Sequence, residues 1–586
     1  MKNSTLRPRY GKRSAANNET AILNSREKII LWLALAAFFL LLARYFYLQI
    51  VRGNYYKQVA QNQYQQLVNY QGERGKIYTS DGNLLVGNHQ IYQLYIEPKS
   101  LEQSFEQVYS LVSPIILADP EASASLKPLG TALSQVAEKQ TRGIVSLARG
   151  LNQDSHDALQ ALNIKGLQFE TSLRRFYSEK TMAAQTLGFL SKDNNSGRYG
   201  IEGGLNKELE SKNSQTLVTV DGGKNPIYFN DNLLTQNLDG RDVYLTIRKD
   251  IQILLEDSLA EAMRKYGAAR GEIIVMEPKT GKILGLATSP SYDPERYYEY
   301  DASLYKNPAI VDLYEPGSTF KVLTVAAGID SGVISPDTVC TKCSGPRVID
   351  KYTIRTWDDV YHPGINMTEA LEKSDNTAMI FITDLLGGER LKKYLRNFGI
   401  GEKLNLGTQE DVPSNFPSDW GPVEIATRAF GQGVSLSSLQ LMRAVGAIAN
   451  EGKMMQPYLV EKAVDGATGE IFTTQPAMMR QVISSETAAT VSKMMQQAAQ
   501  HGEAQYVYKN TEIIAGKTGT AQIANAGGYE DNATIASFIG FAPYDDPKFL
   551  MFVKFERPQS SPWAAETAAP TFKEIAEKLF VIFNIN

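Results

Sequence analysis

An uninterrupted apolar run near the amino terminus is the feature that most restricts how this chain can fold. The run covers residues 29–43, and after Arg44 a tyrosine-containing segment extends it to residue 51. A helix over residues 29–51 would be about 34 Å long, enough to cross the roughly 30 Å hydrocarbon core of a bilayer. Residues 1–28 carry seven basic side chains against two acidic ones, and such a flank stays in the cytoplasm. We therefore predict a single-pass cell (inner) membrane protein with a cytoplasmic tail over 1–28, a transmembrane helix over 29–51 and an extracytoplasmic remainder.

The alternative for this segment is a cleaved signal peptide. No small-x-small cleavage site follows the apolar run, so the uncleaved anchor is favoured. In the anchor, Tyr45 and Tyr47 would lie in the far interfacial belt, and Arg44 would extend its charge to the headgroups.

Composition narrows the class of the remaining chain. Its 586 residues suggest about three or four domains, and 43% hydrophobic with 21% charged residues is typical of a globular protein. The net charge of −4, without a basic stripe beyond the amino terminus, argues against a nucleic-acid partner. Four histidines and no G-x-S-x-G elbow make a Ser-His-Asp hydrolase a poor fit. We expect no cofactor and no catalytic metal.

A serine and a lysine follow a Pro-Gly turn in the segment Glu315-Pro316-Gly317-Ser318-Thr319-Phe320-Lys321. The residues after it are apolar at helical spacing, which predicts that Ser318 lies at the first turn of a buried helix. Lys321 would lie on the same face, within reach of the Ser318 hydroxyl. A serine is a weak nucleophile until a base takes its proton, and a neutral lysine can act as that base.

The S-x-x-K pattern alone proves little, because it also begins at Ser25 and Ser303. Two further motifs distinguish Ser318, namely Ser374-Asp375-Asn376 and then Lys517-Thr518-Gly519-Thr520. The three motifs, in this order, are the signature of penicillin-binding proteins and class A β-lactamases.

The region after a boundary near 238–241 is predicted to form one antiparallel sheet with helices packed on it. A helix comes first, with its apolar residues from Ile251 to Met263 in one stripe. Two strand-like segments, 272–276 and 282–287, follow on either side of a second Lys-Thr-Gly at 279–281, which is interpreted as a hairpin turn. Two more strand-like segments, 533–542 and 549–555, come before a carboxyl-terminal amphipathic helix over 572–583. Strands at both ends of a mostly helical middle favour an α+β architecture.

The stretch between the anchor and this boundary contains no cluster that looks catalytic. We predict a polar helix over 52–73, a hairpin at Asp81-Gly82 and a helical stretch over 100–162. Charged segments at Arg174-Arg175 and 197–202 are interpreted as an ion-paired structural scaffold.

The motifs together resemble those of a class B penicillin-binding protein, a membrane-anchored peptidoglycan transpeptidase without a glycosyltransferase domain. The resemblance covers nearly the whole chain, through the three motifs and the segments 48–49, 74–77, 200–202, 431–433 and 537–543. It implies an elongated pedestal (dimerisation-type) domain over 52–240 and a penicillin-binding (transpeptidase) domain over 241–586. The block 537–543 is more similar to the division- and sporulation-specific branch than to the elongation branch. The sequence departs from the family pattern at two places in the pedestal: Tyr78-Thr79-Ser80-Asp81 replaces the usual residues before the hairpin turn, and Gln185 replaces a common histidine. These departures affect the assignment to a branch of the family and not the assignment of the reaction.

The resemblance implies a role for each motif residue. Ser318 would attack the carbonyl between the two terminal D-alanines of a stem peptide, with Lys321 as the base. Ser374 would relay a proton to the leaving amine, and Asn376 would hold the substrate amide. Asp375 would point away and play a structural part.

The third motif would bind the substrate carboxylate. Lys517 would supply positive potential, and the segment Thr518-Gly519-Thr520 would line the site with its two hydroxyls on the carboxylate. Backbone N–H groups of Ser318 and Thr520 would form the oxyanion hole. An amine from a neighbouring strand would then resolve the acyl-enzyme into a cross-link.

The expected partners are peptidoglycan stem peptides, β-lactams, a membrane-embedded glycosyltransferase and other division-complex proteins, with a septal role in cell division. The alternatives are an elongation-specific transpeptidase for cell shape, a D,D-carboxypeptidase, a β-lactamase, a β-lactam sensor and a scaffold. A β-lactamase would not need this anchor and pedestal, and about 28 cytoplasmic residues leave little room for a signalling domain. A scaffold should have lost one of the motifs.

Two cysteines, Cys340 and Cys343, form a C-x-x-C on the extracytoplasmic side. They can be a small-loop disulfide, a reduced pair or half of a zinc site. Asp358, Asp359 and His362 are near enough in sequence to complete a zinc site, but the disulfide or the idle pair is favoured.

Overall fold

The computed structural model describes residues 25–138, 143–220, 226–227, 238–508, 511–525 and 528–585. The cytoplasmic tail expected over 1–28 therefore lies almost wholly outside the described residues. The chain divides into two compact units, one of residues 1–70 with 214–236 and the other of 71–213 with 237–586.

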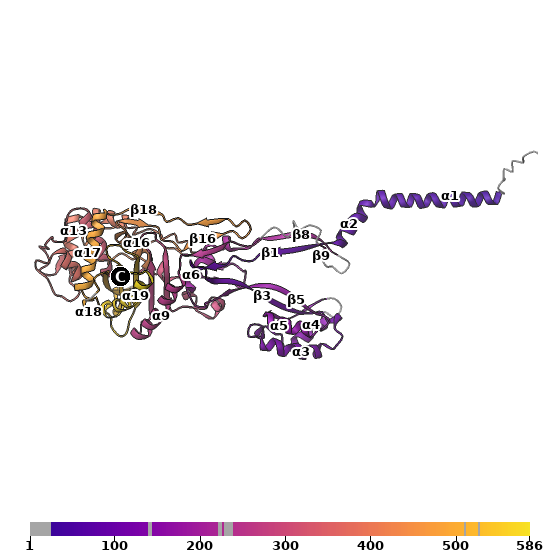
Figure 1. The fold of residues 1–586 in the computed structure, drawn as a ribbon, viewed down its shortest axis with the longest axis horizontal. Helices are drawn as coiled ribbons and strands as arrows, with labels where there is room; N and C mark the ends of the chain where they lie inside the picture. The colour runs from indigo at the N-terminus through magenta and orange to yellow at the C-terminus, as the bar shows by residue number, and fades with distance from the viewer. Residues whose placement is uncertain are drawn as a thin grey trace, which may run out of the picture. The chain divides into compact units, whose positions relative to one another are not determined.

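The first unit begins with the apolar helix. Helix α1 (Ser25–Phe46) continues through a π-helical turn η1 (Tyr47–Val51), and together they give a span of 26 residues, Arg26–Val51, that is long and apolar enough to cross a membrane. Helix α2 (Gly53–Tyr64) follows (Figure 1). The prediction of a polar helix over 52–73 is wrong beyond Tyr64, because β1 (Gln65–Gln71) pairs with β8 (Asn213–Val220), which pairs with β9 (Pro226–Ile227).

The pedestal part of the second unit is built on a long sheet. Its strand order is β17-β16-β10-β2-β3-β4, with β5 also paired to β3. The strands are β2 (Ile77–Tyr78), β3 (Leu84–Ile96), β4 (Val145–Leu151), β5 (Leu167–Tyr177), β10 (Asp242–Leu245), β16 (Val460–Val464) and β17 (Ile471–Thr473). The predicted hairpin at Asp81-Gly82 is confirmed between β2 and β3, with Gly82 at a positive φ of 81°.

Three helices pack beside β3 and β4: α3 (Phe105–Ala118), α4 (Leu129–Glu138) and α5 (Gln153–Ala161) (Figure 1). The prediction of an all-helical stretch over 100–162 missed β4. This strand pairs with β3 and buries Val145, Leu147 and Leu151, so non-local pairing and burial decide its structure. Shorter elements complete the pedestal: η2 (Pro98–Ser100), η3 (Ser123–Ser125), α6 (Ala184–Leu187), β6 (Phe189–Leu190), β7 (Gly197–Arg198), α7 (Gly200–Gly204) and α8 (Asn206–Leu209).

The ion-paired scaffold expected in the pedestal is confirmed around Glu202. Its carboxylate is fully buried and accepts hydrogen bonds from Arg74 Nε at 2.8 Å and Arg175 Nε at 2.7 Å. Burial alone would raise the pKa of Glu202, but the two guanidinium groups outweigh it and hold the pKa below its ordinary value. The cluster is therefore a structural junction that ties together segments far apart in sequence.

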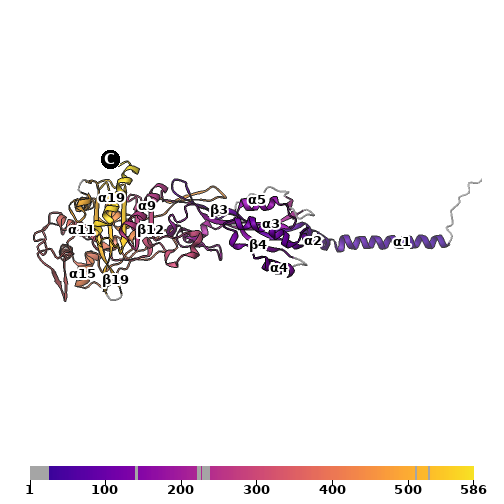
Figure 2. The ribbon, with the colours of Figure 1, turned by 90° about the horizontal axis from the view of Figure 1, so that it is seen from below.

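The catalytic part of the second unit contains a five-stranded antiparallel sheet in the order β12-β11-β21-β20-β19 (Figure 2). The strands are β11 (Arg270–Met276), β12 (Ile283–Ser289), β19 (Ala515–Asn525), β20 (Gly528–Ala542) and β21 (Phe549–Glu556). The second Lys-Thr-Gly, at 279–281, is the turn between β11 and β12, as predicted.

Alternating residues of β11 enter two different cores. Ile273 and Val275 pack with α9 (Lys249–Tyr266) and α19 (Ala568–Ile582), whereas Ile274 and Met276 join the core of the helical middle. That middle contains α10 (Pro308–Val311), α11 (Lys321–Asp330), α12 (Met367–Glu372), α13 (Asn376–Leu386), α14 (Gly388–Asn397), α15 (Pro422–Arg428), α16 (Ser438–Ala449) and α17 (Ser485–His501). The predicted α+β class, a sheet covered by helices, is confirmed.

The remaining elements of this part are short. They are η5 (Pro294–Glu299), η6 (Ala302–Leu304), η7 (Gly317–Phe320), β13 (Arg347–Ile349), β14 (Tyr352–Ile354), β15 (Lys453–Met455), β18 (Met478–Gln481), α18 (Gln505–Tyr508) and η8 (Ala564–Glu566).

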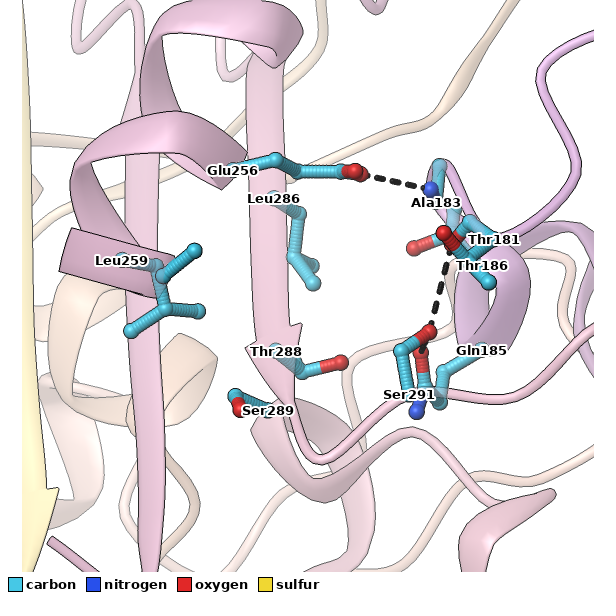
Figure 3. Close-up of a pocket in the computed structure, with 11 residues that line it drawn as sticks. Thr181, Ala183, Gln185, Thr186, Glu256, Leu259, Leu286, Thr288, Ser289 and Ser291 are labelled. Carbon is cyan, nitrogen blue, oxygen red and sulfur yellow. Dashed lines mark hydrogen bonds between the residues drawn. The ribbon is translucent and has the colours of Figure 1, made fainter. Parts of the chain in front are cut away.

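Pedestal and catalytic sheet meet at a cavity of about 160 Å³ bordered by α9, β12 and the segment 181–186 (Figure 3). Glu256 of α9 accepts a hydrogen bond from the backbone N–H of Ala183 at 2.7 Å. Gln185 donates to the carbonyl of Pro290 at 3.0 Å and accepts from the Ser291 hydroxyl at 3.3 Å. The residue that departs from the family pattern is thus a buried contact between the two parts.

Candidate active site

Ser318 lies in the 3-10 turn η7, which leads directly into α11. Gly317 has a positive φ of 56°, and a Cβ there would lie 3.2 Å from the Cβ of Ala521 on β19. Glycine therefore permits both the turn and its close approach to the edge strand. The helix behind the turn is buried from Lys321 to Gly328, so the half-buried Ser318 lies at the start of a buried helix, as predicted.

Lys321 is 1% exposed and points toward the second motif. Its Nζ donates to the backbone carbonyl of Ser374 and, at 3.2 Å, to the Ser374 hydroxyl. Burial, followed by the nearby charge of Lys517, lowers the pKa of Lys321 to about 7, although Glu503 and Asp375 oppose this shift. A large fraction of this amine is therefore neutral near neutral pH.

The second motif connects α12 to α13. Ser374 is buried with a positive φ of 57°, a conformation that turns its carbonyl and hydroxyl toward Lys321. Asp375 caps α13, and its Oδ1 accepts from the backbone N–H groups of Thr377 at 2.7 Å and Ala378 at 3.1 Å. Asp375 thus plays the structural part expected of it. The Asn376 amide donates to the carbonyl of Arg355 at 2.9 Å and lines the cleft.

The third motif lies on β19, the edge strand of the sheet. Lys517 is 3% exposed, and its Nζ donates to the Thr518 hydroxyl at 3.1 Å. Burial lowers the pKa of Lys517, and Glu503 opposes the shift. A Cβ on Gly519 would lie 2.7 Å from Thr319 Cγ2, so glycine lets the strand run against the Ser318 turn.

The two threonines of this motif have different surroundings. Thr518 is 4% exposed, and its hydroxyl donates to Glu503 Oε2 at 2.5 Å. Thr520 lines the cleft, and its hydroxyl accepts from the backbone N–H of Ala564 at 3.2 Å. The Thr518 hydroxyl, which the resemblance assigns to the substrate carboxylate, is therefore hydrogen-bonded to the carboxylate of Glu503.

Two cavities open at Ser318. A cleft of about 940 Å³ also contacts Asn376, Gln432 and Arg557, and a smaller cavity of about 260 Å³ also contacts Glu503. The cavities share Ser318, Trp357, Thr520 and Trp563. Sequence analysis missed Glu503, Trp357 and Trp563, since they come from separate loops and form no motif.

Cys340 and Cys343 form a disulfide with their Cα atoms 5.7 Å apart, which leaves neither thiolate free to bind zinc. The further residues considered as zinc ligands do not gather around the two cysteines as a ligand set. Asp359 pairs with Arg355 at 2.9 Å, and His362 Nδ1 lies 3.7 Å from Asp375 Oδ2. In the described ranges, no group of three or more histidine, cysteine or acidic residues could hold a metal ion.

Comparison with known proteins agrees with this geometry. Residues 271–577 match the family of the penicillin binding protein transpeptidase domain, and residues 69–245 match the penicillin-binding protein dimerisation domain. Stage V sporulation protein D of Bacillus subtilis is 30% identical over 509 residues, which cover 86% of this chain and 77% of that protein. Peptidoglycan D,D-transpeptidase FtsI of Buchnera aphidicola is 28% identical over 521 residues, 88% of this chain and 87% of that one.

The fold has solved counterparts as well. The crystal structure of penicillin binding protein 2X from Streptococcus thermophilus superposes with a TM-score of 0.72 at 22% identity, covering 88% of this chain and 80% of that one. The chain therefore belongs to the class B penicillin-binding proteins. It is a serine-type transpeptidase with a dimerisation domain and an apolar helix that fits a membrane anchor.

Proposed function

We propose that this chain cross-links peptidoglycan stem peptides through an acyl-enzyme on Ser318. The observation that carries the proposal is Lys321, a buried amine with a pKa of about 7, one helical turn from Ser318 and bonded to Ser374. Lys321 takes the proton of Ser318, whose oxygen attacks the carbonyl between two terminal D-alanines. Ser374 relays a proton to the leaving D-alanine amine, so the peptide C–N bond breaks as the ester forms.

The remaining motif residues bind and polarise the donor. Backbone N–H groups of Ser318 and Thr520 stabilise the oxyanion, and Asn376 holds a substrate amide. Lys517 attracts the terminal carboxylate, and the Thr520 hydroxyl donates to it beside Gly519; the Thr518 hydroxyl can also donate once it gives up its hydrogen bond to Glu503. An amine of a second stem peptide then attacks the ester and releases Ser318. β-Lactams react at the same serine.

The membrane arrangement follows from charge. Residues 1–28 are the cytoplasmic tail, 29–51 the transmembrane helix, 52–240 the pedestal and 241–586 the catalytic domain on the outer side. The basic tail supports this orientation.

Similarity to a sporulation protein and to FtsI supports a septal role, with a membrane-embedded glycosyltransferase and other division-complex proteins as partners. Depletion of the protein should give filaments with unfinished septa. Rounded, swollen cells would favour the elongation-specific alternative.

The chemical test is labelling with a penicillin. The label should attach to a peptide containing Ser318, and Ser318→Ala should abolish it. Label that persists in this variant would exclude Ser318 as the nucleophile. A stem-peptide donor offered with and without an acceptor amine separates the transpeptidase from a D,D-carboxypeptidase, which would give only hydrolysis.

A further inference from the structure

The smaller cavity at Ser318 has walls suited to a cation. Three aromatic side chains line it, from Trp357, Tyr506 and Trp563, together with the carboxylates of Glu503 and Glu566. Among the described residues that line it, none carries a positive charge. Aromatic faces and carboxylates both attract an ammonium group, and the three rings are exposed and can be reached by one from solvent.

The aromatic wall is formed by three separate segments, with Trp357 and Trp563 in loops and Tyr506 in helix α18. The rings of Trp357 and Trp563 meet edge to face, with centroids 5.2 Å apart. The Tyr506 hydroxyl donates to the carbonyl of Ala565, which ties the third ring to the Trp563 loop. Burial and then the charge of Glu566 raise the pKa of Tyr506, so this carboxylate acts on the same wall.

Glu503 connects this cavity to the catalytic strand. Its Oε2 accepts from Thr518 at 2.5 Å, which fixes the carboxylate beside the third motif. Asn376, the expected ligand of the donor amide, lines the large cleft and is not among the residues that line the smaller cavity. The two cavities thus meet at Ser318 and share four lining residues, but Glu503 and Glu566 line the smaller one alone.

We propose that the smaller cavity binds the primary ammonium of the acceptor stem peptide, held by Glu503 and Glu566 against the aromatic wall of Trp357, Tyr506 and Trp563. The inference rests on the proposed function, because it assigns the second substrate of that reaction. Glu503 accepts a hydrogen bond from Thr518, the neighbour of Lys517, which is expected to attract the carboxylate of the departing D-alanine. The bound ammonium gives one proton to solvent before its nitrogen attacks the ester, and the attacking amine passes a second proton through Ser374 and Lys321 to the departing Ser318 oxygen, the reverse of the acylation route.

The test uses the full chain in detergent and a D-alanyl thioester donor that carries no amine. The acyl-enzyme partitions between water and an added nucleophile, either Nα-acetyl-L-lysine amide, which is cationic, or hydroxylamine, which is largely neutral at pH 7. Glu503→Gln should raise the lysine amide concentration at half-maximal aminolysis by about tenfold, because a charged hydrogen bond is lost. Trp357→Leu and Glu566→Gln should raise it several-fold, and hydroxylamine partitioning should not change.

Glu486→Gln is the matched control, since it removes the same charge at the far end of α17, the helix that ends just before Glu503. The inference would be overturned if the lysine amide concentration at half-maximal aminolysis were unchanged in Glu503→Gln, Glu566→Gln and Trp357→Leu. It would also be overturned if the corresponding hydroxylamine concentration rose by the same factor. If Glu503→Gln cannot be acylated, the other two variants decide.

A second pair of donors, with and without a side-chain amine, identifies the source of the ammonium. A Glu503→Gln effect confined to acylation by the amine-bearing donor would assign the cavity to the donor and overturn the acceptor assignment. Failure of the wild-type chain to form an acyl-enzyme at Ser318, or to transfer it to any amine, would instead count against the proposed function.

Discussion

The two lysines of the site should respond in opposite ways to the same substitution. Lys321→Arg keeps a charge but removes the base, because a guanidinium is not deprotonated in proteins. Lys517→Arg keeps the charge, which is the property that the substrate carboxylate requires. We therefore expect Lys321→Arg to be far more damaging to penicillin acylation than Lys517→Arg.

The size of the difference follows from the pKa of Lys321. This pKa falls from 10.5 to about 7, first through burial and then through the charge of Lys517. At pH 7 about half of the amine is neutral, against roughly one molecule in three thousand for an unperturbed lysine. Loss of this base should slow acylation by roughly a thousandfold or more. Lys517→Arg should slow acylation by about tenfold at most, mainly because the larger guanidinium group must be packed into the same space.

The pH profile provides an independent check. The acylation rate of the wild type should rise through about pH 7 as Lys321 loses its proton. It should fall again at higher pH, because Lys517 is also buried with a lowered pKa and eventually loses its charge. Lys517→Arg should lack this descending limb. Lys517→Gln should move the ascending limb to higher pH, since the cation that lowers the pKa of Lys321 is gone.

The assay is the rate of labelling by a fluorescent penicillin, measured from about two pH units below the ascending midpoint to two above. The reasoning is refuted if Lys321→Arg and Lys517→Arg are equally impaired, or if Lys517→Arg is the worse of the two. A wild-type rate that is flat through pH 7 would also refute it.

Three further predictions concern other parts of the chain. Gly519→Val should cut penicillin acylation more than tenfold with little change in melting temperature, because its Cβ would push the edge strand from the Ser318 turn. Glu202→Gln should lower the free energy of unfolding by about 3–5 kcal/mol, by leaving its two buried arginines without a counter-charge. Since the folded pKa of Glu202 is lowered, this stability exists above its unfolded pKa and is lost as pH falls through the folded value, which denaturant titrations at several pH values measure. Replacing Cys340 and Cys343 by serine should lower stability by about 2 kcal/mol or less in the same titrations, because the loop they close is short; thiol labelling without prior reduction would contradict the disulfide.

The parts of the fold that sequence predicted are those in which local pattern and final burial agree. The apolar residues of α9 and those after Ser318 recur at helical spacing; α9 buries one face, and α11 is buried from Lys321 to Gly328. Strands β1 and β4 were missed because their partners are distant in sequence, so tertiary pairing outweighs local preference. The motif residues could be identified from the order of the three motifs along the chain. Glu503 could not, since it belongs to no motif and its role depends on its hydrogen bond with Thr518 in the folded chain.

The charges around Ser318 impose conflicting requirements that one carboxylate helps to balance. Lys321 must be neutral to act as a base, and the charge of Lys517 favours its deprotonation. Lys517 must stay charged to attract a carboxylate, yet its own burial lowers its pKa. Glu503 raises the pKa of Lys517 but also that of Lys321, so a carboxylate closer to Lys321 would keep that amine protonated and unable to act as a base. Its hydrogen bond goes to Thr518 rather than to either lysine, so Glu503 raises the pKa of both amines through its charge alone.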